Sequence, residues 1–229
     1  MSVYAIADLH LSLGVDKPMD IFPGWTDYIG RLENNWRRLV TQRDAVVIAG
    51  DISWGMTMEE AAADFAFIQS LPGQKYLLKG NHDYWWSTKK KMETFFSENS
   101  WDTLHIVHNN AYVLNEQYAV CGTRGWFYDA EADADKKVLL REVGRLRTSI
   151  EAARSTGKEP LVFLHYPPVY ADALCDEIWQ ELHAHSITRC YYGHIHGAGI
   201  KRAVRGELDG IRLHLISCDA VGFTPVYVP

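Results

Sequence analysis

The sequence predicts an α/β protein in which two mixed β-sheets pack face to face and helices cover their outer faces, a four-layer α-β-β-α sandwich. The first observation is a regular alternation of strand-like and helix-like segments over about the first hundred residues. The second is a group of short strand-like segments separated by turn residues, and the third is a long amphipathic helix followed by more strands. We expect a single domain over residues 1–229, because this length supports one substantial core.

The alternation in the first half predicts a parallel sheet with right-handed crossover connections. The strand-like segments are short and apolar, as buried parallel strands tend to be. The helical segments carry apolar residues at helical spacing. The predicted strands are 3–7, 45–49 and 75–78, and the predicted helices are 31–42, 58–70 and 87–96.

The second half predicts short hairpins followed by longer elements. Because turn residues separate 105–107, 111–114 and 118–121, we expect these three segments to pair as antiparallel strands. Two long loops, 11–30 and 122–133, are candidates for functional segments. The remaining predicted elements are helices at 133–155 and 171–183 and strands at 161–164, 190–192, 211–217 and 224–228.

Composition and charge argue against several classes of function. The net charge of −6 gives no support to non-specific binding of nucleic acid. The chain has neither a signal-peptide pattern at its start nor an apolar stretch near the roughly 18 residues that span a bilayer. The four cysteines, Cys121, Cys175, Cys190 and Cys218, lie far apart in the sequence. We therefore expect a cytoplasmic protein with reduced thiols and no membrane partner, and we leave its oligomeric state open.

Five short segments contain residue types that bind metal ions, and each follows a predicted strand. Asp8 and His10 are two residues apart, so on an extended chain their side chains point the same way and can bind one ion. His194 and His196 repeat this spacing at another strand end. The five segments are Asp8-Leu9-His10, Gly50-Asp51, Gly80-Asn81-His82-Asp83, His165 and Gly193-His194-Ile195-His196.

These donors are imidazoles and oxygens without thiolate, a set that suits Mn, Fe, Zn, Co or Ni rather than Ca. The carboxylate of Asp51 has two oxygens and could bridge two ions, which would then hold a hydroxide nucleophile and the phosphoryl oxygens of a substrate. Two divalent ions outweigh the charges of Asp8 and Asp51, and the surplus suits an anionic substrate such as a phosphate ester. His82, beside Asn81, is placed to protonate a leaving group, and Asp83 could orient its imidazole.

The five motifs together resemble the calcineurin-like metallophosphoesterases, whose pattern D-x-H, G-D, G-N-H-[DE], H and G-H-x-H they reproduce in order from residue 8 to residue 196. The resemblance implies a β-sandwich flanked by helices, of the small stand-alone bacterial type. It further implies a leaving-group or phosphate-binding role for His82 and hydrolysis by a hydroxide that bridges two transition-metal ions, with Mn, Fe or Zn as the first candidates. The implied ligands are Asp8, His10, Asp51 and His196 for one ion, and Asp51, Asn81, His165 and His194 for the other.

The competing interpretation is a non-catalytic, metal-containing interaction scaffold of the same fold. The presence of His82 favours the enzyme, because a purely structural site does not need a leaving-group acid. We expect a small phosphorylated substrate, and the acidic composition disfavours nucleic acid. Phosphomonoesters, phosphodiesters and phosphoproteins all stay open as substrate classes.

Several further residues have two possible roles. Arg124 lies between two glycines after a predicted strand, and we predict that it clamps the phosphate, with a plain surface arginine as the alternative. Trp54, Trp85 and Trp86 lie close to predicted ligands and could line the substrate pocket or pack in the core. We expect surface or strand-edge positions for the histidines that match no motif, which are His105, His108, His183, His185 and His214.

Overall fold

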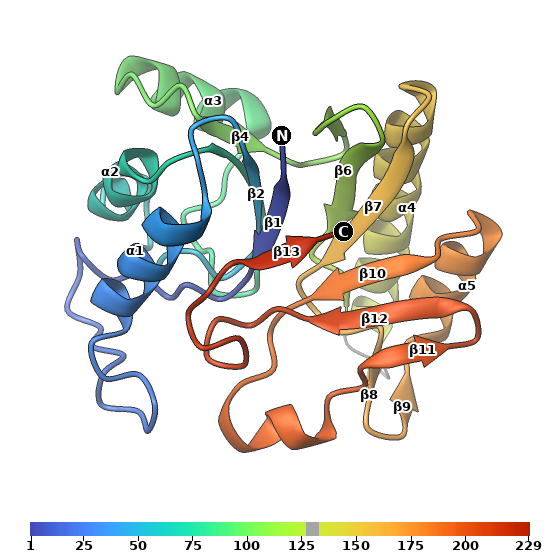
Figure 1. The fold of residues 1–229 in the computed structure, drawn as a ribbon. Coiled ribbons are helices and arrows are strands. Elements are labelled where there is room, and N and C mark those ends of the chain that lie inside the picture. Colours follow the sequence, from blue (N-terminus) through green and yellow to red (C-terminus); the bar gives the residue numbers. More distant parts are fainter. Residues whose placement is uncertain (127–132) are drawn as a thin grey trace.

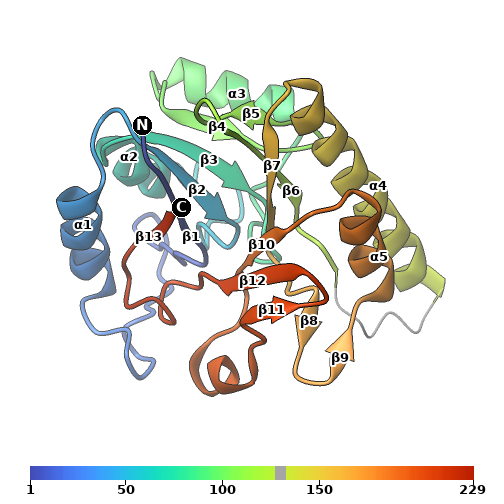
Figure 2. The same cartoon turned by 45° about the vertical axis from the view of Figure 1, so that its right-hand side comes forward.

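Two β-sheets lie face to face and helices cover their outer faces, the arrangement that the sequence predicts (Figure 1). The computed structural model describes residues 1–126 and 133–229. Helices α1, α2 and α3 cover one sheet, and α4 and α5 cover the other, which is clearest in the turned view of Figure 2. The four layers of the predicted sandwich are therefore present.

The first sheet has the strand order β13-β1-β2-β3-β4. Its four strands β1 to β4 are parallel, and β13 is antiparallel at the edge beside β1. The strands are β1 (Val3–Ile6), β2 (Ala45–Ala49), β3 (Gln74–Leu78), β4 (Leu104–Ile106) and β13 (Val226–Val228). The helices that connect the parallel strands are α1 (Tyr28–Leu39), α2 (Ala62–Ser70) and α3 (Lys89–Glu98).

The second sheet has the order β11-β12-β10-β7-β6-β5, with four central parallel strands and an antiparallel strand at each edge. Its strands are β5 (Tyr112–Val113), β6 (Tyr118–Thr123), β7 (Glu159–Leu164), β10 (Arg189–Tyr192), β11 (Gly206–Leu208) and β12 (Ile211–Leu215). Also present are α4 (Asp133–Ser155), α5 (Asp176–Ala184), the hairpin β8 (Val169–Tyr170) and β9 (Ala173–Leu174), and a 3₁₀ helix, η1 (Gly197–Arg202).

The alternation of side chains along the strands divides the core into layers. In β2, Ala45, Val47 and Ala49 belong to the core between the two sheets, whereas Val46 and Ile48 pack toward the helices. All five are fully buried, as expected for a parallel strand that is covered on both faces. The two sheets are joined at their carboxyl edge by a parallel bridge between Ala7 and Ser217, so residues that follow strands of either sheet come together there.

The structure corrects several predicted elements. The segment predicted at 105–107 does not pair with the next segment: β4 continues the parallel sheet beside β3, because α3 supplies the crossover that parallel pairing requires. Only β5 and β6 form the expected antiparallel pair. The helix predicted from residue 171 begins at Asp176, because 169–174 form the small β8–β9 hairpin. Of the loop predicted at 122–133, residues 127–132 lie outside the described part.

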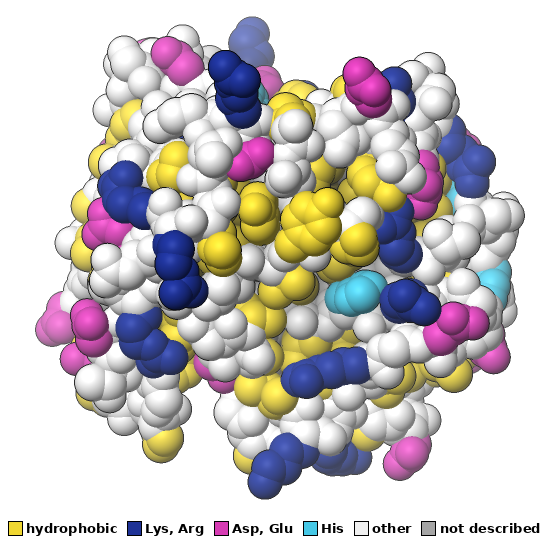
Figure 3. All heavy atoms as spheres, viewed as in Figure 1, with side chains coloured by type: hydrophobic (Ala, Val, Ile, Leu, Met, Phe, Trp, Pro, Cys, Tyr) yellow, Lys and Arg dark blue, Asp and Glu magenta, His cyan; other side chains and the backbone are white. Residues whose placement is uncertain are grey.

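The surface in the view of Figure 1 mixes charges of both signs. Figure 3 shows basic and acidic side chains interspersed on this face, with apolar side chains in the middle, where the two sheets meet. Among the described helices, none combines the length and the apolar character needed to cross a membrane.

Candidate metal centre

The predicted ligands meet at the edge where the strands of both sheets end. Asp8 follows β1, Asp51 follows β2 and Asn81 follows β3, while His165 and His194 follow β7 and β10 of the second sheet. Backbone hydrogen bonds tie these ends together, since the N–H of residue 8 donates to the carbonyl of residue 50 at 2.9 Å, and that of residue 193 donates to the carbonyl of residue 165 at 3.1 Å. The five motifs therefore form one site.

Four of the ligand residues have left-handed backbone conformations. The φ angles are 61° for Asp8, 46° for His10, 50° for Asp51 and 71° for His194. We expected Asp8 and His10 to point the same way because they lie on an extended chain, and this reason is wrong. Their side chains converge because the chain turns sharply after the strand. Non-glycine residues with such φ angles are uncommon and often mark functional sites.

Glycines beside the ligands allow the strand ends to approach closely. A Cβ atom at Gly80 would lie 2.1 Å from Oδ1 of Asp51, and a Cβ atom at Gly193 would lie 2.6 Å from Oδ2 of Asp8. Both distances are too short for any side chain. The glycine in each motif is thus explained by the carboxylate that packs against it.

The ligand atoms form two clusters. Asp8, His10 and His196 form the first, and each offers a ligand atom within 4.8 Å of those of the others. The Nε2 atoms of His10 and His196 are 3.4 Å apart, and the Nε2 atom of His196 lies 3.6 Å from Oδ1 of Asp8. Asp219 holds the His196 ring from behind, with its Oδ1 atom 2.9 Å from Nδ1. A hydrogen bond from Nδ1 to this carboxylate leaves Nε2 to face the cluster, as in carboxylate–histidine–metal arrangements.

Asp51, His165 and His194 form the second cluster, also within 4.8 Å. The Nδ1 atom of His165 lies 3.2 Å from the carbonyl oxygen of Ala49, which can only accept a hydrogen bond. In the neutral ring the proton is therefore on Nδ1, and the lone pair of Nε2 points toward Oδ1 of Asn81, 2.6 Å away, and toward Nδ1 of His194, 3.2 Å away. Several electron-rich atoms thus face one another, an arrangement that a cation would stabilise.

Asp51 lies between the two clusters. Its Oδ2 atom is 3.8 Å from Nε2 of His10 in the first cluster and 3.5 Å from Nε2 of His165 in the second. Its Oδ1 atom accepts a hydrogen bond from the backbone N–H of His82 at 2.8 Å. The hydrogen bond fixes one oxygen and leaves the other facing the ligands of both clusters.

Burial and mutual charge set the protonation of these side chains. Burial, followed by the charge of Asp8, raises the pKa of Asp51 to about 8. Burial lowers the pKa values of His10 and His194 to about 3, so both rings are neutral at pH 7. Burial also acts to lower the pKa of His196, but Asp8 and Asp219 outweigh it and raise that pKa to about 10. The buried carboxylates thus create a demand for positive charge, and the donor set of carboxylate, amide and imidazole fits two transition-metal ions.

His82 lies at the rim of the clusters. Its ring centroid is 5.8 Å from that of His10 and 4.6 Å from the indole of Trp54, and its Nδ1 atom is 3.5 Å from the hydroxyl of Tyr84. Burial lowers its pKa. Because the ring is only half-buried, it can meet a group that enters from solvent.

Asp83 does not orient His82 as we predicted. Its carboxylate is fully buried and accepts the backbone N–H groups of residues 51, 52 and 80 at 2.7 to 2.9 Å, and the indole N–H of Trp85 at 3.0 Å. The chain turns after Asn81, so that Asp83 points inward beneath the ligand loops while His82 points outward. Asp83 is therefore a positioning residue that joins the loops after β2 and β3.

The structure places the side chain of Arg124 beside the centre, in contact with Glu142 and Trp126. Its Nη2 atom lies 3.8 Å from Oε1 of Glu142, and the guanidinium lies 4.7 Å from the centre of the Trp126 ring. Only its backbone joins the metal centre directly, because its carbonyl accepts the N–H groups of His165 and Tyr166 at 3.1 and 2.8 Å. Phosphate binding by Arg124 stays a prediction.

The three tryptophans separate into different roles. Trp54 stacks on His10, with 5.0 Å between ring centroids, and therefore lines the centre. Trp85 packs in the core against Phe65 and serves Asp83. Trp86 lies against His108, 6.1 Å away, outside the ligand clusters.

Sequence reasoning missed two contributors. Asp219 follows the predicted strand 211–217, so its place after a strand was a usable signal. Trp25 belongs to the loop 11–30 and lies 5.9 Å from the His10 ring and 5.8 Å from the His196 ring, a contact that no local pattern indicates. Together with Met19, Phe22 and Pro23, it forms an apolar pocket beside His196.

The histidines without a motif lie outside both clusters. His105 is 2.8 Å from Oε1 of Gln74, His185 pairs with Glu181 at 2.9 Å, and His214 stacks on Tyr191. These contacts are structural, as expected.

Comparisons with known proteins agree with this architecture. A family model described as calcineurin-like phosphoesterase matches residues 1–198. Phosphopantetheinyl hydrolase (PptH) from Mycobacterium tuberculosis is similar in structure, with a TM-score of 0.58, 14% identity and coverage of 94% of this chain and 88% of that one. TT1561 of Thermus thermophilus (TM-score 0.57, 11% identity, 95% and 89% covered) and AQ665 from Aquifex aeolicus, titled a protein of unknown function (0.54, 13%, 99% and 95%), share the fold. No curated protein sequence matched the chain.

Proposed function

Because the chain belongs to the calcineurin-like phosphoesterase family, we propose that it is a dinuclear metal-dependent phosphoesterase that hydrolyses small phosphate mono- or diesters. The observation that carries this proposal is the position of Asp51. One of its oxygens is fixed by the backbone, and the other faces histidines of both clusters at 3.8 and 3.5 Å. A carboxylate in this position suits a ligand shared by two ions.

The ligand sets follow from the two clusters. Asp8, His10 and His196 would hold the first ion and His165, His194 and Asn81 the second, with Asp51 common to both. When bound, two such ions neutralise phosphoryl oxygens and lower the pKa of water, so that a nucleophile is available near neutral pH. Mn, Fe and Zn fit the donor set best.

The protein's own side chains supply orientation and a proton. Asp219 fixes the ring of His196, and Ala49 fixes the ring of His165 through its carbonyl group. His82, on the rim, would donate a proton to the leaving-group oxygen or bind a phosphoryl oxygen. Trp54 covers both His82 and His10 and would exclude water from that side.

A metal-containing scaffold without activity is the alternative function. The rim position of His82 favours the enzyme, because its half-exposed ring serves neither cluster as a structural ligand. The apolar pocket of Met19, Phe22, Pro23 and Trp25 opens beside His196 and would accept an apolar part of a substrate.

The test is a paired assay of p-nitrophenyl phosphate and its bis-ester after loading with Mn²⁺, Fe²⁺ or Zn²⁺, together with metal analysis. We expect two equivalents of metal and turnover of at least one ester, and the preferred ester separates monoesterase from diesterase. Two bound metals without turnover of either ester or of a phosphopeptide would support the scaffold instead.

A further inference from the structure

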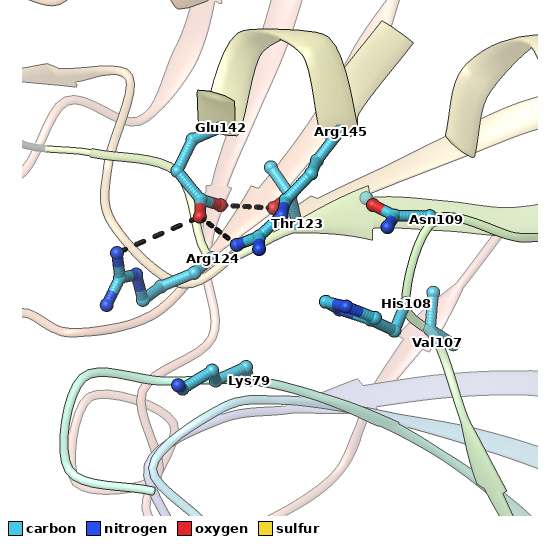
Figure 4. Close-up of a pocket in the computed structure, with 9 residues that line it drawn as sticks. Lys79, Val107, His108, Asn109, Thr123, Arg124, Glu142 and Arg145 are labelled. Carbon is cyan, nitrogen blue, oxygen red and sulfur yellow. Dashed lines mark hydrogen bonds and ion pairs between the residues drawn. The ribbon is translucent and has the colours of Figure 1, made fainter. Parts of the chain in front are cut away.

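A second polar pocket lies beside the metal centre and is rich in positive charge. We call it the basic pocket and define it by Lys79, His108, Arg124, Glu142 and Arg145, which all line it. Figure 4 shows the guanidinium of Arg124 and the amine of Lys79 on the same side of this pocket, with Glu142 and Arg145 above. Three cations thus surround one carboxylate.

Glu142 already has its own partners. Its side chain is only 2% exposed, and its oxygens receive hydrogen bonds from the hydroxyl of Thr123 at 2.5 Å and from Nη1 of Arg145 at 2.6 Å. Arg124 approaches it only to 3.8 Å, beyond hydrogen-bond distance. One buried acid needs one cation, and Arg145 meets that need.

Arg124 and Lys79 have capacity for another anion. Among residues 1–126 and 133–229, the buried Nε atom of Arg124 has no hydrogen-bond partner, and Lys79 makes no ion pair. Burial lowers the pKa of Lys79, and the charge of Arg124 lowers it further, so the two cations repel each other. A guanidinium and an amine arranged in this way match the oxygens of a phosphate or a carboxylate.

The basic pocket is continuous with the metal centre. Lys79 is two residues before the ligand Asn81, a span of at most about 7 Å along the chain. The carbonyl of Arg124 accepts the backbone N–H of the ligand His165 at 3.1 Å. A small molecule with two anionic groups can therefore reach both places at once.

We propose that the basic pocket binds a second anionic group, phosphate or carboxylate, of a substrate whose phosphate ester lies at the metal centre. This inference rests on the proposed function and names its substrate class as bis-anionic. Lys79 and Arg124 then determine specificity, and the metal centre carries out the reaction. The second anion is held by charge and hydrogen bonds in a partly desolvated place, where such contacts are strong.

The test compares a short alkane-diol bisphosphate with the alkyl monophosphate of equal chain length, on the metal-loaded protein. We expect kcat/KM for the bisphosphate to exceed that for the monophosphate by about 10- to 100-fold, the effect of one charged hydrogen bond. Lys79→Gln should abolish most of this ratio, chiefly through KM. The control Lys90→Gln removes an exposed lysine of α3 and should keep the ratio. A ratio near one for every linker length, or an unchanged ratio in Lys79→Gln, would overturn the proposal.

A second measurement separates this inference from the proposed function. Calorimetric binding of the non-hydrolysable alkane bisphosphonate and monophosphonate reports on the pocket even if no ester is turned over. Tighter binding of the bisphosphonate, lost in Lys79→Gln, supports the pocket, and equal binding overturns it. If added sulfate activates monophosphate turnover while the bisphosphate gains nothing, the pocket takes a free anion and the substrate assignment is wrong.

Discussion

Replacing Asp51 with asparagine tests whether one carboxylate oxygen serves both metal ions. The amide has the same shape but only one acceptor oxygen. If that oxygen keeps the hydrogen bond from the N–H of His82, now 2.8 Å long, the NH₂ group faces His10 and His165 where the ions would bind. If the amide flips, its NH₂ group meets the N–H of His82, and a buried donor loses its partner.

The flipped state costs about 1–3 kcal/mol for the unsatisfied donor, and the unflipped state removes the shared ligand. Since about 1.4 kcal/mol corresponds to tenfold in affinity, Asp51→Asn should weaken both ions by about tenfold or more. Metal analysis after dialysis, and competition with a chelator, measure this loss. Asp102→Asn removes one exposed carboxylate away from the site and is the matched control. Two full equivalents of metal in Asp51→Asn, with unchanged affinity, would refute the shared-ligand reasoning.

Three other substitutions separate the roles of neighbouring residues. His82→Ala should retain metal but lower kcat by about 10²–10⁴, the range for general acid–base catalysis; the loss should shrink for activated leaving groups, and an equal loss for all leaving groups would indicate phosphate binding. Asp83→Asn should lower the free energy of unfolding by about 2–6 kcal/mol, because two of its backbone donors lose an acceptor; a urea midpoint equal to that of the wild type would contradict this. Asp219→Asn should weaken the ion held by His196 by about 10- to 100-fold and spare the other, so equal weakening of both ions in a stepwise titration would count against it.

The ligands could be predicted from sequence because parallel strands impose a common edge. Each ligand follows an apolar strand, and the chain places all strand ends of one sheet together. The partner of Asp83 could not be predicted, because its neighbour in sequence, His82, points the opposite way after a sharp turn. The contacts of Arg124 depend on α4, whose Glu142 and Arg145 are far away in sequence. Local patterns thus identify residues at strand ends, whereas tertiary packing decides which way each side chain points.

The left-handed backbone at the ligands indicates where the geometry of the centre originates. Asp8, His10, Asp51 and His194 all have φ between 46° and 71°, and such conformations cost about 1–3 kcal/mol each for non-glycine residues. The hydrogen bonds that Asp83 accepts from the loops after β2 and β3 offset part of this cost. These contacts form within the protein and involve no ligand of the second sheet. The fold therefore sets the ligand positions through buried backbone hydrogen bonds, and a cation would meet donors that are already oriented.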